Sequence, residues 1–144
     1  MTLDREIALV TGASRGIGRA AAASLAKNGA LVIGTATTEP GAAGITEHLK
    51  DFGGFGVVLD VTSDDSVSAL FGQLKEESRT PGIVVNNAGI NSDNLSLRMK
   101  NEEWKKVIDI NLTSTFLLSK HAIKKMLKSK FGRIVNITSV VGHT

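Results

Sequence analysis

In the stretch Val10-Thr11-Gly12-Ala13-Ser14-Arg15-Gly16-Ile17-Gly18-Arg19, three glycines follow the spacing G-x-x-x-G-x-G. Residues 6–10 before it form an apolar run typical of a β-strand, and residues 20–27 after it are strong helix formers. Glycine lets the backbone turn tightly and approach a ligand, and the start of a helix offers unpaired N–H groups with partial positive charge. The stretch therefore predicts a strand, a phosphate-binding loop and a helix in succession.

Two other interpretations of the glycines are weaker. A P-loop is excluded, because no Gly-Lys-Ser or Gly-Lys-Thr follows them. In the second interpretation, the glycines bind no ligand and only permit the tight turn between strand and helix. That alternative is disfavoured because the junction opens a chain in which strands and helices alternate.

Strand-like and helix-like runs alternate along the whole chain. The predicted strands are residues 6–11, 30–35, 55–60, 83–86 and 133–138. The predicted helices are residues 16–28, 40–52, about 62–78 and about 101–129, the last with apolar residues at near-helical spacing on one face. This alternation predicts a doubly wound α/β fold, the Rossmann fold, with a parallel sheet in the strand order 3-2-1-4-5.

Composition narrows the class of protein. Hydrophobic residues at 42% and charged residues at 22% are typical of a soluble globular domain. No apolar stretch is long enough to cross a bilayer and residues 1–6 do not form a signal peptide, so no membrane association is expected. The absence of cysteine excludes thiol catalysis and favours a cytoplasmic location. The three histidines lack metal-ligand spacing, and no metal site is expected.

Basic side chains dominate the last part of the chain. No acidic residue follows Asp109, whereas the basic residues after it are Lys120, Lys124, Lys125, Lys128, Lys130 and Arg133. Two interpretations stay open: a solvated helix face with lysines near the helix C-terminus, and a surface for an acidic partner. Nucleic-acid binding is not expected, because few aromatic residues are interleaved with these charges.

The candidate site lies where the predicted strands end. In such sheets, ligands bind outside the carboxyl ends of the strands. The first strand ends in the loop 12–18, the third in Asp60-Val61, the fourth in Asn86-Asn87-Ala88-Gly89 and the fifth in Ser139. These residues are therefore expected at one edge of the sheet.

The end of the second strand indicates which nicotinamide cofactor is bound. An NAD enzyme usually places an acid there for the ribose hydroxyl, but this strand runs into Thr37-Thr38 without one. Glu39 precedes Pro40 and is expected to open the second helix. Arg15 offers a guanidinium and Thr37 a hydroxyl for a 2′-phosphate, so we predict NADPH.

These motifs together resemble the short-chain dehydrogenase/reductase family. Residues 11–18 resemble its T-G-x-x-x-G-x-G cofactor loop and residues 86–89 its N-N-A-G motif. The resemblance implies that Asp60 touches the adenine amino group, that Asn111 takes part in a proton relay and that Ser139 hydrogen-bonds the substrate carbonyl. The cofactor-binding residues so expected are Gly12, Ala13, Ser14, Arg15, Gly16, Ile17, Gly18, Thr37, Asp60, Val61, Asn87, Ala88 and Gly89, and the catalytic ones are Asn111 and Ser139.

A narrower resemblance, through residues 9–19, 32–37, 94–100 and 132–134, is to bacterial reductases of fatty-acid biosynthesis. It implies NADPH-dependent reduction of a 3-oxoacyl group carried on acyl carrier protein, a small acidic protein. It also implies a basic docking surface that includes Lys130, and a homotetramer paired through the long helix. The alternatives are another ketone or alcohol oxidoreductase of this family, or a nucleotide-binding module without catalysis.

The proton donor of the family is a tyrosine in a Y-x-x-x-K motif that should follow Ser139, and the sequence contains no tyrosine. Either the 144 residues belong to a longer reductase, or the protein does not use this mechanism. An apolar fifth strand at the sheet edge would promote aggregation unless another segment covered it. We therefore expect residues 1–144 to form an NADP-binding Rossmann domain that is incomplete at its C-terminus.

Overall fold

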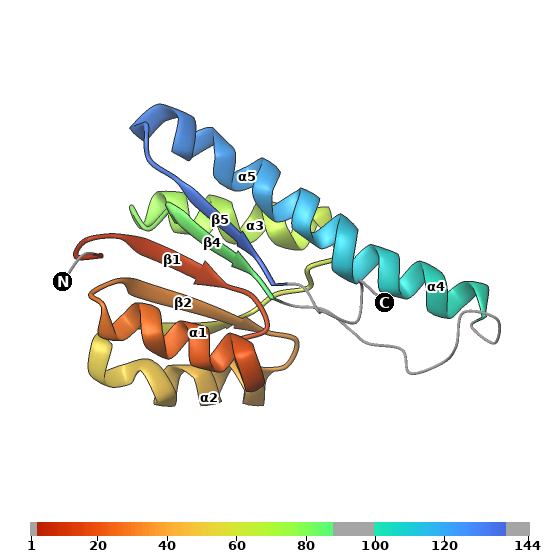
Figure 1. Cartoon of the computed structure of the whole chain (residues 1–144), viewed down its shortest axis with the longest axis horizontal. Helices are drawn as coiled ribbons and strands as arrows, with labels where there is room; N and C mark the ends of the chain where they lie inside the picture. Colours follow the sequence, from red (N-terminus) through yellow and green to blue (C-terminus); the bar gives the residue numbers. More distant parts are fainter. Residues whose placement is uncertain (1–2, 88–99, 138–144) are drawn as a thin grey trace.

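The computed structural model describes residues 3–87 and 100–137, and in these ranges strands and helices alternate as predicted (Figure 1). The first elements are β1 (Ile7–Val10), α1 (Gly16–Lys27), β2 (Leu31–Ala36), α2 (Glu39–Leu49), a 3-10 turn (Lys50–Phe52) and β3 (Phe55–Val58). They are followed by α3 (Asp64–Glu76), β4 (Ile83–Asn86), α4 (Asn101–Ile108), a π-helical turn (Asp109–Thr113), α5 (Ser114–Ser129) and β5 (Arg133–Asn136).

The strands form one five-stranded sheet in the order β3-β2-β1-β4-β5, with every neighbouring pair parallel. This confirms the predicted fold and strand order. Val10 at the end of β1 pairs with Gly34 of β2 on one side and with Val85 of β4 on the other. The carboxyl ends of the three central strands therefore meet at one edge.

Helices cover both faces of the sheet. On one face of the sheet, Ala8 and Val10 of β1 belong to a buried cluster that includes Ala22 of α1 and Ile45 of α2. Leu9 points to the other face, where α3 and α5 supply buried residues. Successive strand residues point to opposite faces, and both faces are buried at β1, β2 and β4, which explains why these strands are continuous apolar runs.

The long helix predicted for residues 101–129 is interrupted by the π-helical turn. The buried residues of α5 are Ser114, Leu117, Leu118 and Ala122. Apolar residues on another side stay exposed: Trp104, Leu112, Phe116, Ile123 and Leu127. The helix therefore has two apolar faces, only one of which packs against the sheet.

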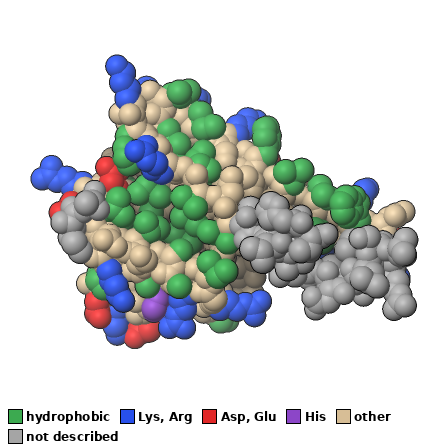
Figure 2. All heavy atoms as spheres, in the orientation of Figure 1, with side chains coloured by type: hydrophobic (Ala, Val, Ile, Leu, Met, Phe, Trp, Pro, Cys, Tyr) green, Lys and Arg blue, Asp and Glu red, His purple; other side chains and the backbone are tan. Residues whose placement is uncertain are grey.

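Apolar side chains also remain exposed on the sheet itself. Ile134 and Val135 of β5 are 36% and 45% exposed. Figure 2 shows apolar side chains gathered over the strands between α1 and α5, and others along α4 and α5. Among the described residues, no helix combines the length and apolar character needed to cross a membrane.

Candidate dinucleotide site

The glycine loop between β1 and α1 has the backbone geometry that its sequence predicts. Gly12 and Gly16 have φ angles of +62° and +60°, in the left-handed region that favours glycine. Gly18 is needed for a different reason: a Cβ there would lie 2.1 Å from the Gly12 carbonyl oxygen and 2.5 Å from Asn87 Nδ2. The start of α1 therefore packs directly on the loop, at a distance that only glycine permits.

Hydrogen bonds from the neighbouring strands fix the loop. The Ala13 N–H donates to the Thr35 carbonyl at the end of β2 (2.9 Å). Asn87, just after β4, donates from Nδ2 to the Gly12 carbonyl (3.1 Å). Its backbone N–H also donates to the Thr11 hydroxyl (3.0 Å). The loop is thus held from both sides, with Asn87 as the link to β4.

The outer side of the loop fits a dinucleotide pyrophosphate. Ser14, Arg15, Gly16 and Ile17 are exposed, and a Cβ at Gly16 would meet nothing within 4 Å. The first turn of α1 contains no acidic residue that would oppose an anion. Free N–H groups at a helix start, a cradle of glycines and open space are what phosphate oxygens require.

The second strand ends beside this loop. A Cβ at Gly41, in the first turns of α2, would lie 3.7 Å from Ser14 Cβ. The Thr38 hydroxyl caps α2 by accepting the Gly41 N–H (3.1 Å), and Thr37 is exposed. Glu39 is the first residue of α2, which confirms that it opens this helix.

The carboxylate of Asp60 is held after β3 by Thr62. The Thr62 hydroxyl donates to Asp60 Oδ1 (2.6 Å), and the Thr62 N–H donates to the same oxygen (3.0 Å). These two bonds, the hydroxyl first, lower the pKa of Asp60 below the ordinary value of an aspartate. The side chain is exposed and ionised at neutral pH, whereas Val61 is buried. Sequence reasoning missed Thr62, although the Asp-x-Thr spacing favours such a turn.

Asn86 and Asn87, at the end of β4, contact different neighbours. While Asn87 contacts the glycine loop, Asn86 Nδ2 donates to Asn136 Oδ1 at the end of β5 (2.8 Å). Asn86 is 7% exposed, and none of the described residues hydrogen-bonds its Oδ1. An unpaired buried acceptor at this edge is available to a donor from a ligand or water.

The predicted catalytic residues are only partly described. Asn111 lies in the π-helical turn and is exposed, and its role in a proton relay stays a prediction. π-Helical turns are rare and occur frequently at functional sites. Ser139, Ala88 and Gly89 lie outside the described residues, and their roles stay predictions.

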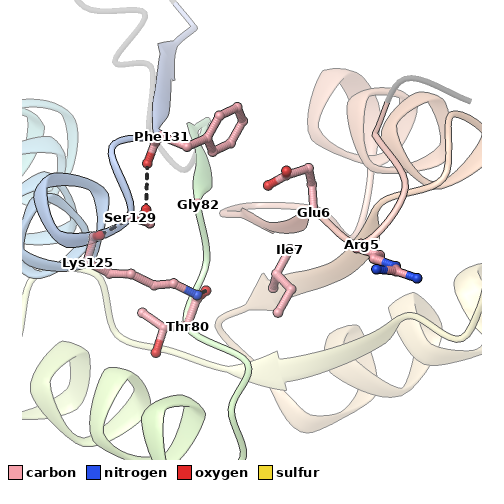
Figure 3. Close-up of a pocket in the computed structure, with 8 residues that line it drawn as sticks. All are labelled: Arg5, Glu6, Ile7, Thr80, Gly82, Lys125, Ser129 and Phe131. Carbon is pink, nitrogen blue, oxygen red and sulfur yellow. Dashed lines mark hydrogen bonds between the residues drawn. The ribbon is translucent and has the colours of Figure 1, made fainter.

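A cavity of about 280 Å³ at the start of β1 and β4 does not belong to this site. Figure 3 shows Lys125 reaching the Thr80 carbonyl (2.9 Å) while Arg5 extends away from it. None of the predicted cofactor-binding or catalytic residues lines this cavity. Among the described residues, no three His, Asp or Glu side chains are grouped to hold a metal ion.

Comparison with known proteins identifies the family. Residues 6–144 match the short chain dehydrogenase family. The chain belongs to the short-chain dehydrogenase family. This confirms the resemblance found in the glycine loop and in the motif that contains Asn87.

Individual short-chain dehydrogenases similar to the chain carry the name 3-oxoacyl-[acyl-carrier-protein] reductase FabG. The protein from Pseudomonas aeruginosa is 54% identical over 144 residues, which cover 99% of this chain and 58% of the relative. The protein from Haemophilus influenzae is 53% identical over 139 residues, which cover 96% of this chain and 57% of the relative. The protein from Escherichia coli K12 is 51% identical over 142 residues, which cover 99% of this chain and 58% of the relative. The chain thus spans less than three fifths of the length of these curated relatives.

Proposed function

We propose that the whole protein is an NADPH-dependent reductase of 3-oxoacyl-[acyl-carrier-protein]. The observation that carries this proposal is the identity of 51–54% to reductases of that name, over nearly all of the chain. The geometry of the glycine loop supports it, because the loop offers N–H groups and open space where a dinucleotide would bind.

The proposed reaction divides between the cofactor and the protein. When bound, NADPH supplies the hydride that reduces the 3-oxo group. Residues 12–18 would hold the pyrophosphate, and the ionised Asp60 would accept a hydrogen bond from the adenine amino group. The Ser139 hydroxyl would donate to the substrate carbonyl oxygen, and Asn111 would help to deliver a proton.

Arg15 is proposed to select NADPH over NADH. It precedes α1 with an extended backbone (φ −160°), and its side chain makes no capping bond to the helix. A guanidinium binds a phosphate by paired charge-assisted hydrogen bonds, which the 2′-hydroxyl of NADH does not reproduce. Thr37, at the end of β2, would add a hydroxyl donor.

This selectivity is tested by measuring the Kd of NADPH and the Kd of NADH for the Arg15→Ala variant and for wild type. We expect NADPH to bind roughly tenfold or more weakly, about 1.4 kcal/mol, with NADH nearly unchanged. The matched control is Arg19→Ala, which removes the same charge one turn further along α1, where the guanidinium contacts His48 Nδ1 (3.3 Å). Equal losses for the two cofactors in Arg15→Ala would refute this assignment.

The activity itself is tested by NADPH oxidation with a 3-oxoacyl thioester. Turnover with the expected 3-hydroxyacyl product supports the reductase. Bound NADPH without turnover by a protein of verified full length would instead support a nucleotide-binding module. Turnover only with unrelated ketones or alcohols would indicate another oxidoreductase of the same family.

We further propose a homotetramer that docks an acidic carrier through basic residues including Lys130. The exposed apolar side chains of Leu112 (64% exposed) and Phe116 (63%), in the N-terminal half of the long helical segment, support pairing through this segment. Lys130 ends α5 with a left-handed backbone (φ +55°) and is exposed to a partner. Sedimentation equilibrium of wild type and Phe116→Glu tests the assembly, and an unchanged mass in the variant would contradict pairing through this face.

A further inference from the structure

A groove of about 700 Å³ lies between α3 and α5, on the other face of the sheet from α1 and α2. It is separate from the glycine loop, and none of the predicted cofactor-binding or catalytic residues lines it. Its position on two packed helices gives it rigid walls. The groove is therefore a feature that the proposed cofactor site does not explain.

The charge of the groove has one sign. Four lysines line it and no acidic residue does. Lys125 is engaged with the Thr80 carbonyl (2.9 Å). Lys75, Lys124 and Lys128 are exposed, and in the part of the chain that the structure describes they form no ion pair. Three uncompensated ammonium groups around one groove favour an anionic occupant.

The groove is also partly apolar. The nearly buried ring of Phe71 lines it, as does Leu127, which is 75% exposed. Gly72 of α3 lines the groove too and borders open space, because a Cβ there would meet nothing within 4 Å. A strip of apolar surface bordered by cations is the complement of an amphipathic helix with acidic flanks.

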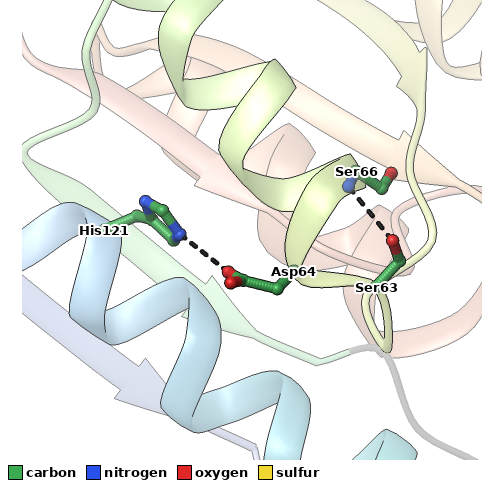
Figure 4. Close-up of polar contacts among 4 residues, drawn as sticks. All are labelled: Ser63, Asp64, Ser66 and His121. Carbon is green, nitrogen blue, oxygen red and sulfur yellow. Dashed lines mark hydrogen bonds and ion pairs between the residues drawn. The ribbon is translucent and has the colours of Figure 1, made fainter.

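A hydrogen bond joins the two helices beside the groove. His121 Nε2 of α5 lies 3.2 Å from Asp64 Oδ1 at the start of α3, and the His121 ring stacks on Phe71 (centroids 5.6 Å apart). Figure 4 shows His121 pointing across to Asp64, next to the capping bond between Ser63 and Ser66. These two contacts link α3 and α5 at the Asp64 end of α3.

We propose that this groove docks an acidic amphipathic helix of acyl carrier protein. The inference rests on the proposed function for the identity of the partner, and on the groove for its location. Carboxylates of the partner helix contact Lys75, Lys124 and Lys128, while its apolar side chains pack over Gly72 and contact Phe71 and Leu127. The docking surface then lies between two helices rather than at Lys130 alone.

Two glycines allow a matched test. Gly72→Glu places a carboxylate and its stem inside the groove. Gly44→Glu adds the same charge to α2, on the other face of the sheet. A Cβ at either position would meet nothing within 4 Å, and glutamate favours a helix more than glycine does, so both variants should fold. Circular dichroism checks that they do.

The measurement is fluorescence anisotropy of labelled acyl carrier protein from Pseudomonas aeruginosa, titrated with each variant. We expect Gly72→Glu to weaken binding about tenfold or more and Gly44→Glu to leave it within about twofold. Lys128→Glu should also weaken binding. Added salt should reduce the affinity of the wild type, since charges are screened over about 8 Å at 0.15 M.

The other outcomes refute the groove. Equal losses in the two glycine variants would show a general effect of charge, and a loss confined to Lys130→Glu would place docking at the end of α5. No binding by the wild type, or binding to anionic vesicles in its place, would exclude the carrier helix. Turnover of a carrier-free 3-oxoacyl thioester tests the proposed function separately, because that substrate does not need the groove.

Discussion

The packing of α1 on the glycine loop makes Gly18→Ala the most informative single substitution. A Cβ at this position would lie 2.1 Å from the Gly12 carbonyl oxygen and 2.5 Å from Asn87 Nδ2, both far below ordinary contact. The nearest atom is backbone, so the loop or the helix must move by roughly 1 Å. That movement would also break the bond from Asn87 to Gly12 (3.1 Å).

Three contributions determine how much Gly18→Ala changes the free energy of unfolding. Overpacking in a rigid region costs about 1–3 kcal/mol. The lost hydrogen bond costs about 1 kcal/mol. The higher helix propensity of alanine returns nearly 1 kcal/mol. We therefore expect a loss of about 2 kcal/mol in the free energy of unfolding, or a Tm lower by about 4–8 °C for a domain of this size.

Two further alanine variants provide the comparison in urea denaturation followed by circular dichroism. Gly44→Ala, in an open position of α2, should stabilise by about 0.5–1 kcal/mol. Gly16→Ala should cost about 1 kcal/mol for its left-handed backbone, without a clash, and should weaken cofactor binding because its methyl enters the open side of the loop. A Gly18→Ala protein as stable as wild type would refute the close approach of α1 to the loop.

Two other substitutions test polar contacts of the site. Thr62→Val removes the larger of the two hydrogen bonds that lower the pKa of Asp60, so a carbon-detected NMR titration should show this pKa rising toward its ordinary value. In wild type, the stability that comes from the depressed pKa is fully present above about pH 4, the ordinary pKa of an aspartate. It is lost as the pH falls through the lower pKa of Asp60 in the folded protein. Asn136→Ala removes the acceptor for Asn86 Nδ2 and should lower the free energy of unfolding by about 1 kcal/mol, measured by urea denaturation. An unchanged pKa or an unchanged stability, respectively, would contradict these contacts.

The fold was predictable because the strands are apolar runs bounded by turn or cap residues, and α2 and α3 begin after Thr38 and Ser63, whose hydroxyls cap them. The observed bounds of the helices outside 101–129 differ from the predicted ones by only a few residues. The Ser63 cap of α3 shows the reason: its hydroxyl accepts the Ser66 N–H (3.1 Å), a contact that depends only on neighbours in sequence. Contacts between near neighbours in the sequence can be predicted from the sequence alone.

Features that depend on tertiary contacts were not predictable to the same degree. The π-helical turn at 109–113, which contains Asn111, has no sequence signal. The periodicity of α5 is compatible with more than one apolar face, so it did not distinguish the buried Leu118 from the exposed Phe116. The anchoring role of the Thr11 hydroxyl depends on β4 lying beside β1, a contact between residues far apart in the sequence.

The two asparagines that follow one another in the chain join the two halves of the candidate site. Asn87 fixes the glycine loop through the Gly12 carbonyl, and Asn86 reaches Asn136 at the end of β5, three positions before Ser139. Neither bond depends on the other, but both start from the end of one central strand, which pairs with β1 and with β5. A displacement of β4 would therefore move the proposed cofactor loop and the strand leading to the predicted catalytic serine together. Two amide side chains in succession therefore contact the elements on both sides of β4: Asn87 contacts the loop after β1, and Asn86 contacts β5.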